Sequence, residues 1–176
     1  MTAQLPAPRG EGYRIAVVCS GNICRSPVAD VVLNDKIAEA GLPGITVDSF
    51  GTGGWHVGEG IDHRSGSSLI AAGYDGSRHR ARQFGPGVAS DYDLVLAMDA
   101  GHFSQLGSLG VPHERLWLFR SWDPEPDGPT GGDVPDPFYG GPAGFTDVLV
   151  MIERTADGIV TDLEAMAQPD VGHRLS

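Results

Sequence analysis

The chain has 176 residues, a formal net charge of −11 at pH 7 and a sequence pI of about 4.7. This length suits a single domain, which at this size buries roughly 70% of its chain surface on folding. The acidic balance argues against nonspecific binding to nucleic acid or to acidic membranes, because both depend on cationic protein surface.

Cysteine usage, histidine spacing and hydropathy exclude further classes. The only two cysteines, Cys19 and Cys24, are too few for a disulfide framework or a Cys-rich zinc site. None of the six histidines lies in a His-x-x-x-His or His-Glu-x-x-His pattern, so we expect no metal and no cofactor. Residues 1–12 have no apolar run of signal-peptide length, and no later stretch approaches the ~18 apolar residues of a membrane span. We therefore expect a protein of the reducing cytoplasm.

The first predicted elements surround Cys19. Tyr13 to Val18 is an apolar, β-branched run typical of a buried parallel strand. Ser26-Pro27 predicts the start of a helix, with Ser26 as the N-cap and Pro27 at the first helical position, and this helix should end near Ala40. Cys19 is therefore expected at the carboxyl end of a strand, one short loop before a helix.

Strands and helices continue to alternate along the chain. Further strands are expected at Ile45 to Phe50, Asp93 to Met98 and Leu116 to Phe119. Further helices are expected from the N-cap Asp62 to about Ala72, from Asp99 to Leu106 and from Phe145 to Met166. This alternation predicts an α/β fold with a parallel sheet, which binds ligands at the carboxyl ends of its strands.

The loop between Cys19 and Arg25 has the composition of an oxyanion site. It contains Ser20, Gly21, Asn22, Ile23 and Cys24. Gly21 and Asn22 tolerate the left-handed dihedrals that let backbone N–H groups curl around a tetrahedral anion. Helix N-termini and nearby cations can lower the pKa of a thiol to roughly 3.5–7.5, and arginine offers a planar fork of donors for two phosphate oxygens. The loop therefore predicts phosphoryl transfer to Cys19, with Arg25 binding the phosphate.

Both residues also have plainer interpretations. Cys19 could be a small apolar residue packed at a strand end, and Arg25 could be a surface arginine paired with one of the many carboxylates. The Cys-x5-Arg spacing by itself is weak. A cation is nevertheless unfavourable at a helix N-terminus unless an anion is present, so the strand and helix that flank the loop favour the catalytic interpretation.

Four stretches resemble one known family in the order in which they occur. Residues 19–27, Cys-Ser-Gly-Asn-Ile-Cys-Arg-Ser-Pro, resemble the signature of the low-molecular-weight protein tyrosine phosphatases. Asp48 to Gly58 resembles the second loop of that family, most like its actinobacterial members. His79 to Gln83, followed by Ala97-Met98-Asp99, fits the middle of the domain, and Asp136 to Gly140 resembles the acid loop.

The resemblance implies a fold, an activity and a domain plan. The fold is a four-stranded parallel sheet of order 2-1-3-4 flanked by helices, with a P-loop at the carboxyl end of strand 1. The activity is hydrolysis of phosphotyrosine in proteins through a phosphocysteine, with inorganic phosphate as product. One domain is expected over residues 13–166, between a flexible leader (1–12) and a flexible tail (167–176), and the protein is expected to be a monomer.

A general acid is expected in the stretch from Ser121 to Pro142. This stretch is rich in Pro, Gly and Asp and could pass for a disordered linker, but long loops between a core strand and an amphipathic helix are often functional. Composition cannot choose among its aspartates, which are Asp123, Asp127, Asp133 and Asp136. The resemblance chooses Asp136, which would protonate the leaving oxygen and later activate water.

The resemblance also implies supporting roles. Ser26 would hydrogen-bond the Cys19 sulfur. A polar network that holds the loop's shape would consist of Asn22, Ser49 and His79. The aromatic walls of a deep cleft, against which a phosphotyrosine ring stacks, would be Trp55, Phe138 and Tyr139. Each of these residues could instead be an ordinary turn residue or loop anchor.

Cys24 suggests redox regulation. It follows Cys19 within one tight loop, and the family has the same pair, so Cys24 could capture a Cys19 sulfenic acid as a disulfide. The alternative is that Cys24 is buried filler with its sulfur pointing away, because a disulfide needs converging Cβ vectors.

Two other functions on the same scaffold remain as alternatives. An arsenate reductase relays a disulfide through downstream cysteines, but no cysteine follows Cys24. A redox-sensing, phosphate-binding module would tolerate loss of the acid or the arginine, whereas both are present here.

Overall fold

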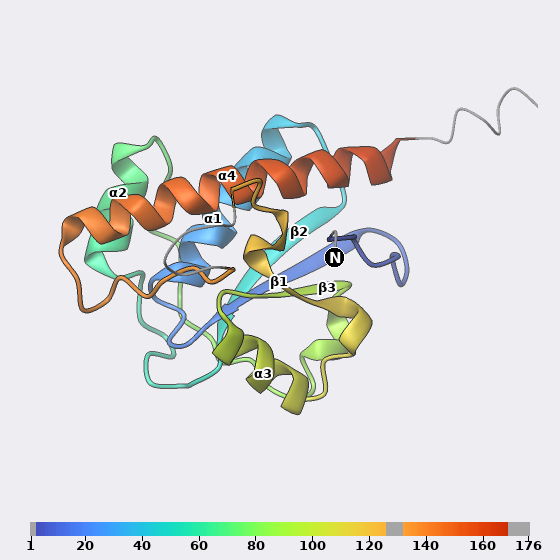
Figure 1. Cartoon of the computed structure of the whole chain (residues 1–176), viewed down its shortest axis with the longest axis horizontal. Coiled ribbons are helices and arrows are strands. Elements are labelled where there is room, and N and C mark those ends of the chain that lie inside the picture. Colours follow the sequence, from blue (N-terminus) through green and yellow to red (C-terminus); the bar gives the residue numbers. More distant parts are fainter. Residues whose placement is uncertain (1–2, 126–131, 169–176) are drawn as a thin grey trace, which may run out of the picture.

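The computed structural model describes residues 3–125 and 132–168 (Figure 1). Its strands and helices are β1 (Tyr13–Cys19), α1 (Arg25–Glu39), β2 (Ile45–Gly51), α2 (His63–Ala71), β3 (Leu94–Ala97), α3 (Ala100–Ser108), β4 (Leu116–Leu118) and α4 (Pro142–Ala167). Every strand and helix expected from the sequence is therefore confirmed, with bounds that differ by a few residues at most.

The four strands form one parallel sheet of order β2-β1-β3-β4, which confirms the predicted fold. β1 is an inner strand: Val18 pairs with Phe50 of β2 on one side and with Ala97 of β3 on the other. The chain crosses to opposite sides of β1 to form β2 and β3, and ligands bind α/β sheets at such switch points. Cys19 ends β1 at this point.

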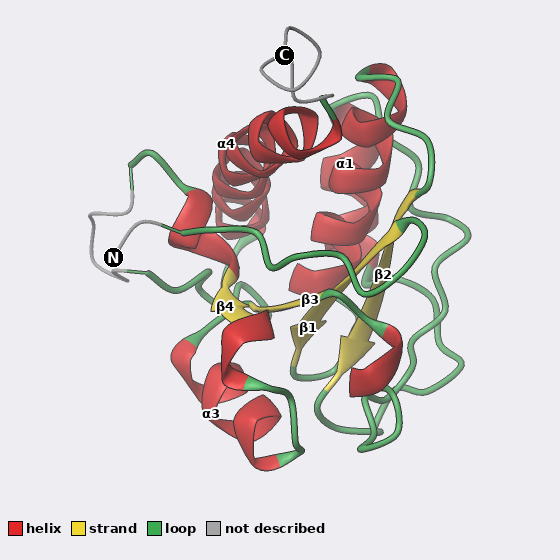
Figure 2. Cartoon of the chain, turned by 90° about the vertical axis from the view of Figure 1, so that its right-hand side faces the viewer, coloured by secondary structure: helices red, strands yellow, loops and turns green. Residues whose placement is uncertain are grey.

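Alternate side chains of β1 contribute to two cores. Ile15 and Val17 belong to the larger core, which includes residues of α1 and α4, while Ala16 and Val18 belong to a smaller core that includes Leu106 of α3. Figure 2 shows α1 and α4 on one face of the sheet and α3 on the other. From Ile15 onward β1 is buried on both faces, and its sequence there is continuously apolar rather than alternating.

The start of α1 differs from the prediction. The N-cap is Cys24, without a side-chain hydrogen bond, and Ser26 lies inside the first turn. The prediction of Ser26 as N-cap was therefore wrong, because its hydroxyl is engaged elsewhere: Ser26 Oγ lies 3.2 Å from the carbonyl O of Phe50, to which it donates. The predicted N-cap of α2 is confirmed, since Asp62 Oδ1 accepts from the Arg64 N–H at 2.8 Å.

Gly158 lets α4 approach the end of the sheet closely. A glycine inside a helix costs about 1 kcal/mol relative to alanine. A Cβ at Gly158 would overlap the carbonyl O of Trp122, which lies in the short 3-10 helix Phe119–Trp122 after β4. Close packing therefore accounts for this glycine. Among the described residues, no helix is long and apolar enough to cross a membrane.

The described part of the leader, residues 3–12, lies against the domain. Tyr13 Oη donates to the carbonyl O of Pro6 at 2.8 Å, and the Arg9 N–H donates to Asp93 Oδ1 at 2.8 Å. Ala3 joins the larger core. This part therefore makes specific contacts with the domain. The predicted tail beyond Gln168 lies outside the described residues.

Candidate active site

The main chain of the loop at residues 19–25 is held from outside through its carbonyl groups. The carbonyls of Cys19, Ser20 and Ile23 accept from the N–H groups of Thr52, Gly53 and Asp62 at 2.8, 3.0 and 2.8 Å. Within the described chain, the N–H groups of residues 20–24 donate to no protein group. The loop can therefore offer these N–H groups to an oxyanion, as its sequence predicts.

Asn22 holds the curl of the loop. Its φ of 60° is the left-handed conformation expected there, and its side chain is buried. Asn22 Nδ2 donates to Ser26 Oγ at 2.9 Å, and Asn22 Oδ1 accepts from the Arg82 N–H at 2.8 Å. The Asn22 carbonyl O lies 2.6 Å from His79 Nε2. The expected contact between Asn22 and His79 is thus present.

Ser49 does not join this network. No hydrogen bond links Ser49 to Asn22 or His79 in the described residues, which contradicts that part of the prediction. The reason is its register: Ser49 pairs with Val17, inside the sheet, before the point where β1 ends.

Two glycines of the second loop allow it to contact the first. A Cβ at Gly51 would lie 2.7 Å from the carbonyl O of Ser20, and a Cβ at Gly53 would overlap the ring of Trp55. The glycine-rich composition of this loop therefore follows from two close approaches, one to the loop at residues 19–25 and one to an aromatic side chain.

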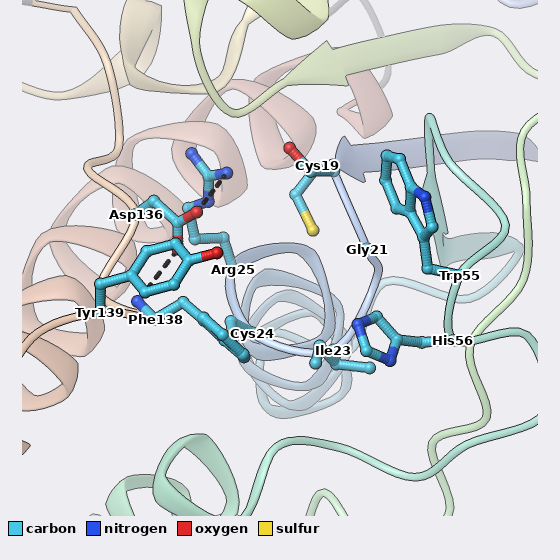
Figure 3. A pocket seen from close by; sticks show the side chains of 11 residues that line it. Cys19, Gly21, Ile23, Cys24, Arg25, Trp55, His56, Asp136, Phe138 and Tyr139 are labelled. Atoms are coloured by element: carbon cyan, nitrogen blue, oxygen red, sulfur yellow. Dashed lines mark hydrogen bonds and ion pairs between the residues drawn. The ribbon is translucent and has the colours of Figure 1, made fainter.

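The loops enclose a pocket of about 310 Å³. Its lining residues are Cys19, Ser20, Gly21, Ile23, Cys24, Arg25, Trp55, His56, Asp136, Phe138 and Tyr139. Figure 3 shows Cys19 Sγ pointing into the space between Trp55 and His56 on one side and Asp136 and Tyr139 on the other. Two of the predicted phosphate-binding residues, Asn22 and Ser26, do not line it; both are buried behind the loop.

Cys19 and Ser26 make the sulfur contact that the resemblance implied. Cys19 Sγ lies 2.9 Å from Ser26 Oγ. Cys24 is also a free, buried cysteine. Burial, with a further contribution from the charge of Asp62, raises the pKa of the Cys24 thiol to about 12, so Cys24 is a neutral thiol at pH 7.

Arg25 is a buried cation with fixed partners. Its side chain is 4% exposed. Arg25 Nη1 donates to Asp99 Oδ2 at 2.8 Å and to the carbonyl O of Val134 at 3.1 Å, and Arg25 Nη2 lies 3.6 Å from Asp136 Oδ2. Burial opposes the charge of Asp99, but hydrogen bonds from the His102 N–H and from Arg25 hold the pKa of this carboxyl below its usual value. Asp99 is therefore ionised at neutral pH.

The described aspartates of the stretch from Ser121 to Pro142 have three different environments. Asp123 has a fully buried side chain that pairs with Arg120 and Arg154. Asp133 Oδ1 accepts from the Ala100 N–H at 3.0 Å, at the start of α3. Asp136 is 46% exposed and is the one of these three that lines the pocket. Asp127 lies outside the described residues.

The predicted aromatic walls lie at the rim of the pocket. Trp55 is 74% exposed and Tyr139 is 93% exposed, so neither is a core anchor. The rings of Phe138 and Tyr139 meet edge to face with centroids 5.0 Å apart. Arg64 lies over the Phe138 ring at 5.2 Å and donates to the Phe138 carbonyl O at 2.8 Å. Arg64 thereby ties this rim to the start of α2.

Sequence reasoning assigned no role to four residues around the site. His56 lines the pocket, and its Nδ1 lies 2.6 Å from Glu59 Oε2. Asp99 contacts Arg25, His102 contacts Ser20, and Arg64 contacts Phe138 at the rim of the pocket. The position of Asp99 in the sequence could have indicated a role. It comes just after β3, and in a parallel sheet the end of β3 lies at the same edge as the end of β1, where Cys19 is. The positions of the other three gave no such indication.

No metal site accompanies these residues. Across residues 3–125 and 132–168, no group of three or more His, Cys, Asp or Glu side chains is arranged to hold a metal ion. The polar side chains that line the pocket include the thiol of Cys19, the guanidinium of Arg25 and the partly exposed carboxyl of Asp136.

Comparison with known proteins gives consistent likenesses. The family model for low molecular weight phosphotyrosine protein phosphatase matches residues 14–168. A low molecular weight protein-tyrosine-phosphatase of Streptomyces coelicolor is 47% identical over 155 residues, which cover 84% of this chain and 92% of the relative. Low molecular weight protein-tyrosine phosphatase A of Mycobacterium tuberculosis is 40% identical over 146 residues, or 82% of this chain and 88% of the relative. The expected likeness to actinobacterial members is thus confirmed.

Solved structures give the same result. The crystal structure of YfkJ from Bacillus subtilis superposes with a TM-score of 0.82 and 30% identity, covering 92% of this chain and all of that one. A protein tyrosine phosphatase from Entamoeba histolytica, crystallised with Hepes in the active site, superposes with a TM-score of 0.81 and 27% identity, covering 89% of this chain and all of that one.

Proposed function

The chain belongs to the low molecular weight phosphotyrosine protein phosphatase family, a family of metal-independent hydrolases, and from this premise we propose that it hydrolyses phosphotyrosine through a phosphocysteine on Cys19. Phosphotyrosine proteins are the substrates that the family implies, and inorganic phosphate is the product. The individual steps below are the proposal.

In the first step, Cys19 Sγ attacks the phosphorus while the bond from phosphorus to the tyrosine oxygen breaks. Arg25 and the inward N–H groups of the loop bind the phosphoryl oxygens and the charge that develops on them. Asp99 and the Val134 carbonyl hold the guanidinium of Arg25 before substrate arrives, at 2.8 and 3.1 Å. Asp136 gives its proton to the leaving tyrosine oxygen.

In the second step, water attacks the phosphocysteine. Asp136, now a carboxylate, takes a proton from the water as the bond between sulfur and phosphorus breaks. Ser26 Oγ lies 2.9 Å from Cys19 Sγ, where its hydroxyl can stabilise the leaving thiolate. Phosphate then leaves, and Cys19 is again free.

One observation carries the proposal. Asp136 and Arg25 approach to 3.6 Å at a pocket that Cys19 Sγ also enters, although they come from distant parts of the chain. A nucleophile, an anion-binding group and a proton donor therefore meet at one place. The exposed rim residues Trp55 and Tyr139 support an aryl phosphate as substrate, because a tyrosine ring can pack against them while its phosphate reaches the loop.

The test is direct detection of the phosphoenzyme. A reaction with an aryl phosphate is quenched in acid within its first turnover, and mass spectrometry then locates the phosphate on Cys19. Cys19→Ser should have no measurable turnover and should form no phosphoenzyme, while its circular dichroism and phosphate binding persist. Turnover by Cys19→Ser, or phosphate found on a different residue, would overturn the mechanism.

Two further expectations accompany the proposal. The two free cysteines and a mechanism that needs a reduced thiol support the cytoplasm as the place of action. A monomer is expected because one chain supplies every proposed catalytic group. Sedimentation measurements test the oligomeric state, and fractionation of the source cell tests the location.

A further inference from the structure

Ser20 and His102 connect the phosphate-binding loop to α3. Ser20 Oγ lies 2.7 Å from His102 Nε2, although the two residues are 82 positions apart. His102 is only 3% exposed. Its other ring nitrogen, Nδ1, lies 3.1 Å from Asp99 Oδ1. The imidazole therefore lies between the residue that follows Cys19 and the partly buried carboxylate of Asp99.

Asp99 extends this connection to the phosphate-binding arginine. Its second oxygen, Oδ2, accepts from Arg25 Nη1 at 2.8 Å. We call these four side chains the His102 bridge; its members are Ser20, His102, Asp99 and Arg25. The bridge begins beside Cys19 and returns to the other end of the same loop, so that two ends of the loop are held by one helix.

The charge state of His102 is set by its surroundings. Burial, followed by the positive charge of Arg25, lowers the pKa of His102 to about 4, against the opposing influence of Asp99, Asp133 and Asp136. The ring is therefore neutral at pH 7 and carries a single N–H. Nδ1 is buried and makes no aligned hydrogen bond in the described residues, so the ionised Asp99 carboxylate beside it favours placing the proton there. Nε2 is then left to accept the Ser20 hydroxyl proton.

We propose that His102 is a positioning residue that holds Ser20 and Asp99, and through Asp99 the guanidinium of Arg25, in the geometry needed for phosphoryl transfer. The proposal deepens the function proposed above and rests on the roles of Cys19 and Arg25 given there. In this arrangement the two serines, Ser20 and Ser26, have different partners. The Ser20 hydroxyl proton is directed to His102 and away from the sulfur, and Ser26 is the serine whose hydroxyl contacts Cys19 Sγ, at 2.9 Å.

Removal of the bridge should lower turnover more than substrate binding. In His102→Phe, Ser20 and Asp99 lose their shared neighbour, and Arg25 can tilt within the pocket. We expect kcat for an aryl phosphate to fall about 10-fold while KM stays within about 2-fold, because a misplaced group costs most in the transition state. Gln105→Ala, an exposed position on the same helix, is the matched control and should leave both constants unchanged. Unchanged kcat in a folded His102→Phe would overturn the proposal.

Two conservative variants separate the two contacts. The amide of a glutamine can reach the position of Nε2, so His102→Gln retains an acceptor for Ser20. The amide of an asparagine reaches only the position of Nδ1, so His102→Asn retains a neighbour for Asp99. Each variant should recover part of the kcat lost in His102→Phe. If both were as slow as His102→Phe, the ring would be a packing element only, and the proposal would be wrong.

A double-mutant cycle tests the link to Ser20. If Ser20 and His102 act through one contact, Ser20→Ala combined with His102→Phe should be no slower than the slower single variant. Multiplication of the two individual losses in the double variant would show that the residues act separately.

A measurement on the unmodified protein keeps the proposal testable even if the variants fail to fold. Nuclear magnetic resonance of the ¹⁵N-labelled protein distinguishes the two neutral tautomers of histidine from the imidazolium. The expected state of His102 at neutral pH is the neutral ring with its proton on Nδ1. A proton on Nε2, or a charged ring, would overturn the bridge. Because this measurement does not depend on turnover, its outcome is separate from whether Cys19 forms the phosphoenzyme.

Discussion

The phosphate-binding loop (residues 19–25) and the acid loop (residues 132–140) meet across one pocket but are held by different kinds of contact. The first is bounded by β1 and α1, and main-chain hydrogen bonds from the second loop hold its carbonyls. The acid loop directly precedes α4, and single long-range contacts hold it. Among these, the Val134 N–H donates to the Met98 carbonyl at 2.7 Å, and Arg120 Nη1 donates to the Asp133 carbonyl at 2.9 Å.

The difference matches the role that we propose for each loop. A phosphate-binding loop, called the cradle below (residues 19–25), must present several N–H groups in one fixed arrangement. The regular secondary structure on both sides of the loop provides this arrangement. A general acid needs one carboxyl that reaches the leaving oxygen and exchanges its proton with water, and Asp136 is half exposed at the pocket's edge. Changes in the cradle should therefore affect all substrates alike, whereas changes in the acid loop should depend on the leaving group.

The largest expected effect is in the cradle. Arg25→Lys keeps the positive charge but loses the planar fork that binds two phosphate oxygens and Asp99 together. We expect kcat to fall by about 10²–10³-fold for every aryl phosphate, by analogy with the loss of one oxyanion donor. Steady-state kinetics with a series of substituted phenyl phosphates measures this, and thermal unfolding checks the fold. Near-normal rates would reduce Arg25 to a structural residue.

The acid loop should give a smaller and more selective effect. Asp136→Ala should lower kcat about 10²-fold for substrates with a basic phenol, which need a proton to leave, and only a few-fold for a phenolate that leaves unaided. A plot of log kcat against leaving-group pKa should therefore be steeper for the variant. Equal slowing of both kinds of substrate would indicate a positioning role for Asp136. Asp133→Ala, which removes the contact with the Ala100 N–H, is the comparison on the same loop.

The same difference explains which parts of the site the sequence could predict. Cys19, the loop and the start of α1 are adjacent in the chain, and their pattern of strand, glycine-containing loop and helix is a local one. The choice of Asp136 needed the family resemblance, because composition does not separate it from Asp123. Asp123 differs through the two arginines that pair with it, Arg120 three residues earlier in a short 3-10 helix and Arg154 in α4.

The residues that the sequence analysis misassigned or missed also depend on contacts with distant parts of the chain. Ser26 has the sequence of an N-cap, but its hydroxyl is surrounded by Cys19, Asn22 and Phe50, which come together only in the folded protein. His102 occurs in a helix with no distinguishing pattern, and its contact with Ser20 depends on how α3 packs under the sheet. Residues whose function comes from such long-range contacts are invisible to periodicity and capping rules.

A moderate effect is expected where α4 anchors the beginning of the acid segment. Burial opposes the charge of Asp123, but hydrogen bonds from Arg154, the Glu125 main chain and Arg120 lower its pKa to about 2. A carboxyl whose pKa is lowered on folding stabilises the fold above its unfolded value, near 3.8, and loses this contribution as the pH falls towards 2. Arg154→Met should cost about 1–2 kcal/mol at pH 7, less than a fully buried pair, because Arg154 is 30% exposed.

Urea unfolding at several pH values measures this effect. The difference between Arg154→Met and the unchanged protein should shrink as the pH is lowered towards 2. A matched control is Lys36→Met, which removes an ion pair with the 68%-exposed Asp157 and should cost at most about 1 kcal/mol. We also expect kcat to fall only a few-fold in Arg154→Met, because Asp133 and Val134 keep their own contacts. A stability difference that does not change with pH would show that the Asp123 carboxylate is not responsible.

The smallest effect on turnover is expected within the cradle itself, at Cys24. Cys24→Ser keeps the size of the side chain and the N-cap position of α1, so kcat should change less than about 2-fold.

The effect of Cys24→Ser should appear only after oxidation. Peroxide converts the Cys19 thiolate to a sulfenic acid, and the Cys24 thiol can then displace water from it to form a disulfide, which dithiothreitol reduces back to two thiols. Because burial raises the pKa of Cys24 to about 12, this capture should be slow near pH 7 and faster as the pH rises. Mild peroxide should thus inactivate the unchanged protein reversibly and Cys24→Ser largely irreversibly, and phosphate should protect both. Equal recovery of the two proteins, or the absence of a crosslinked peptide in mass spectra, would mean that Cys24 serves packing and that the cradle has no protection of its own.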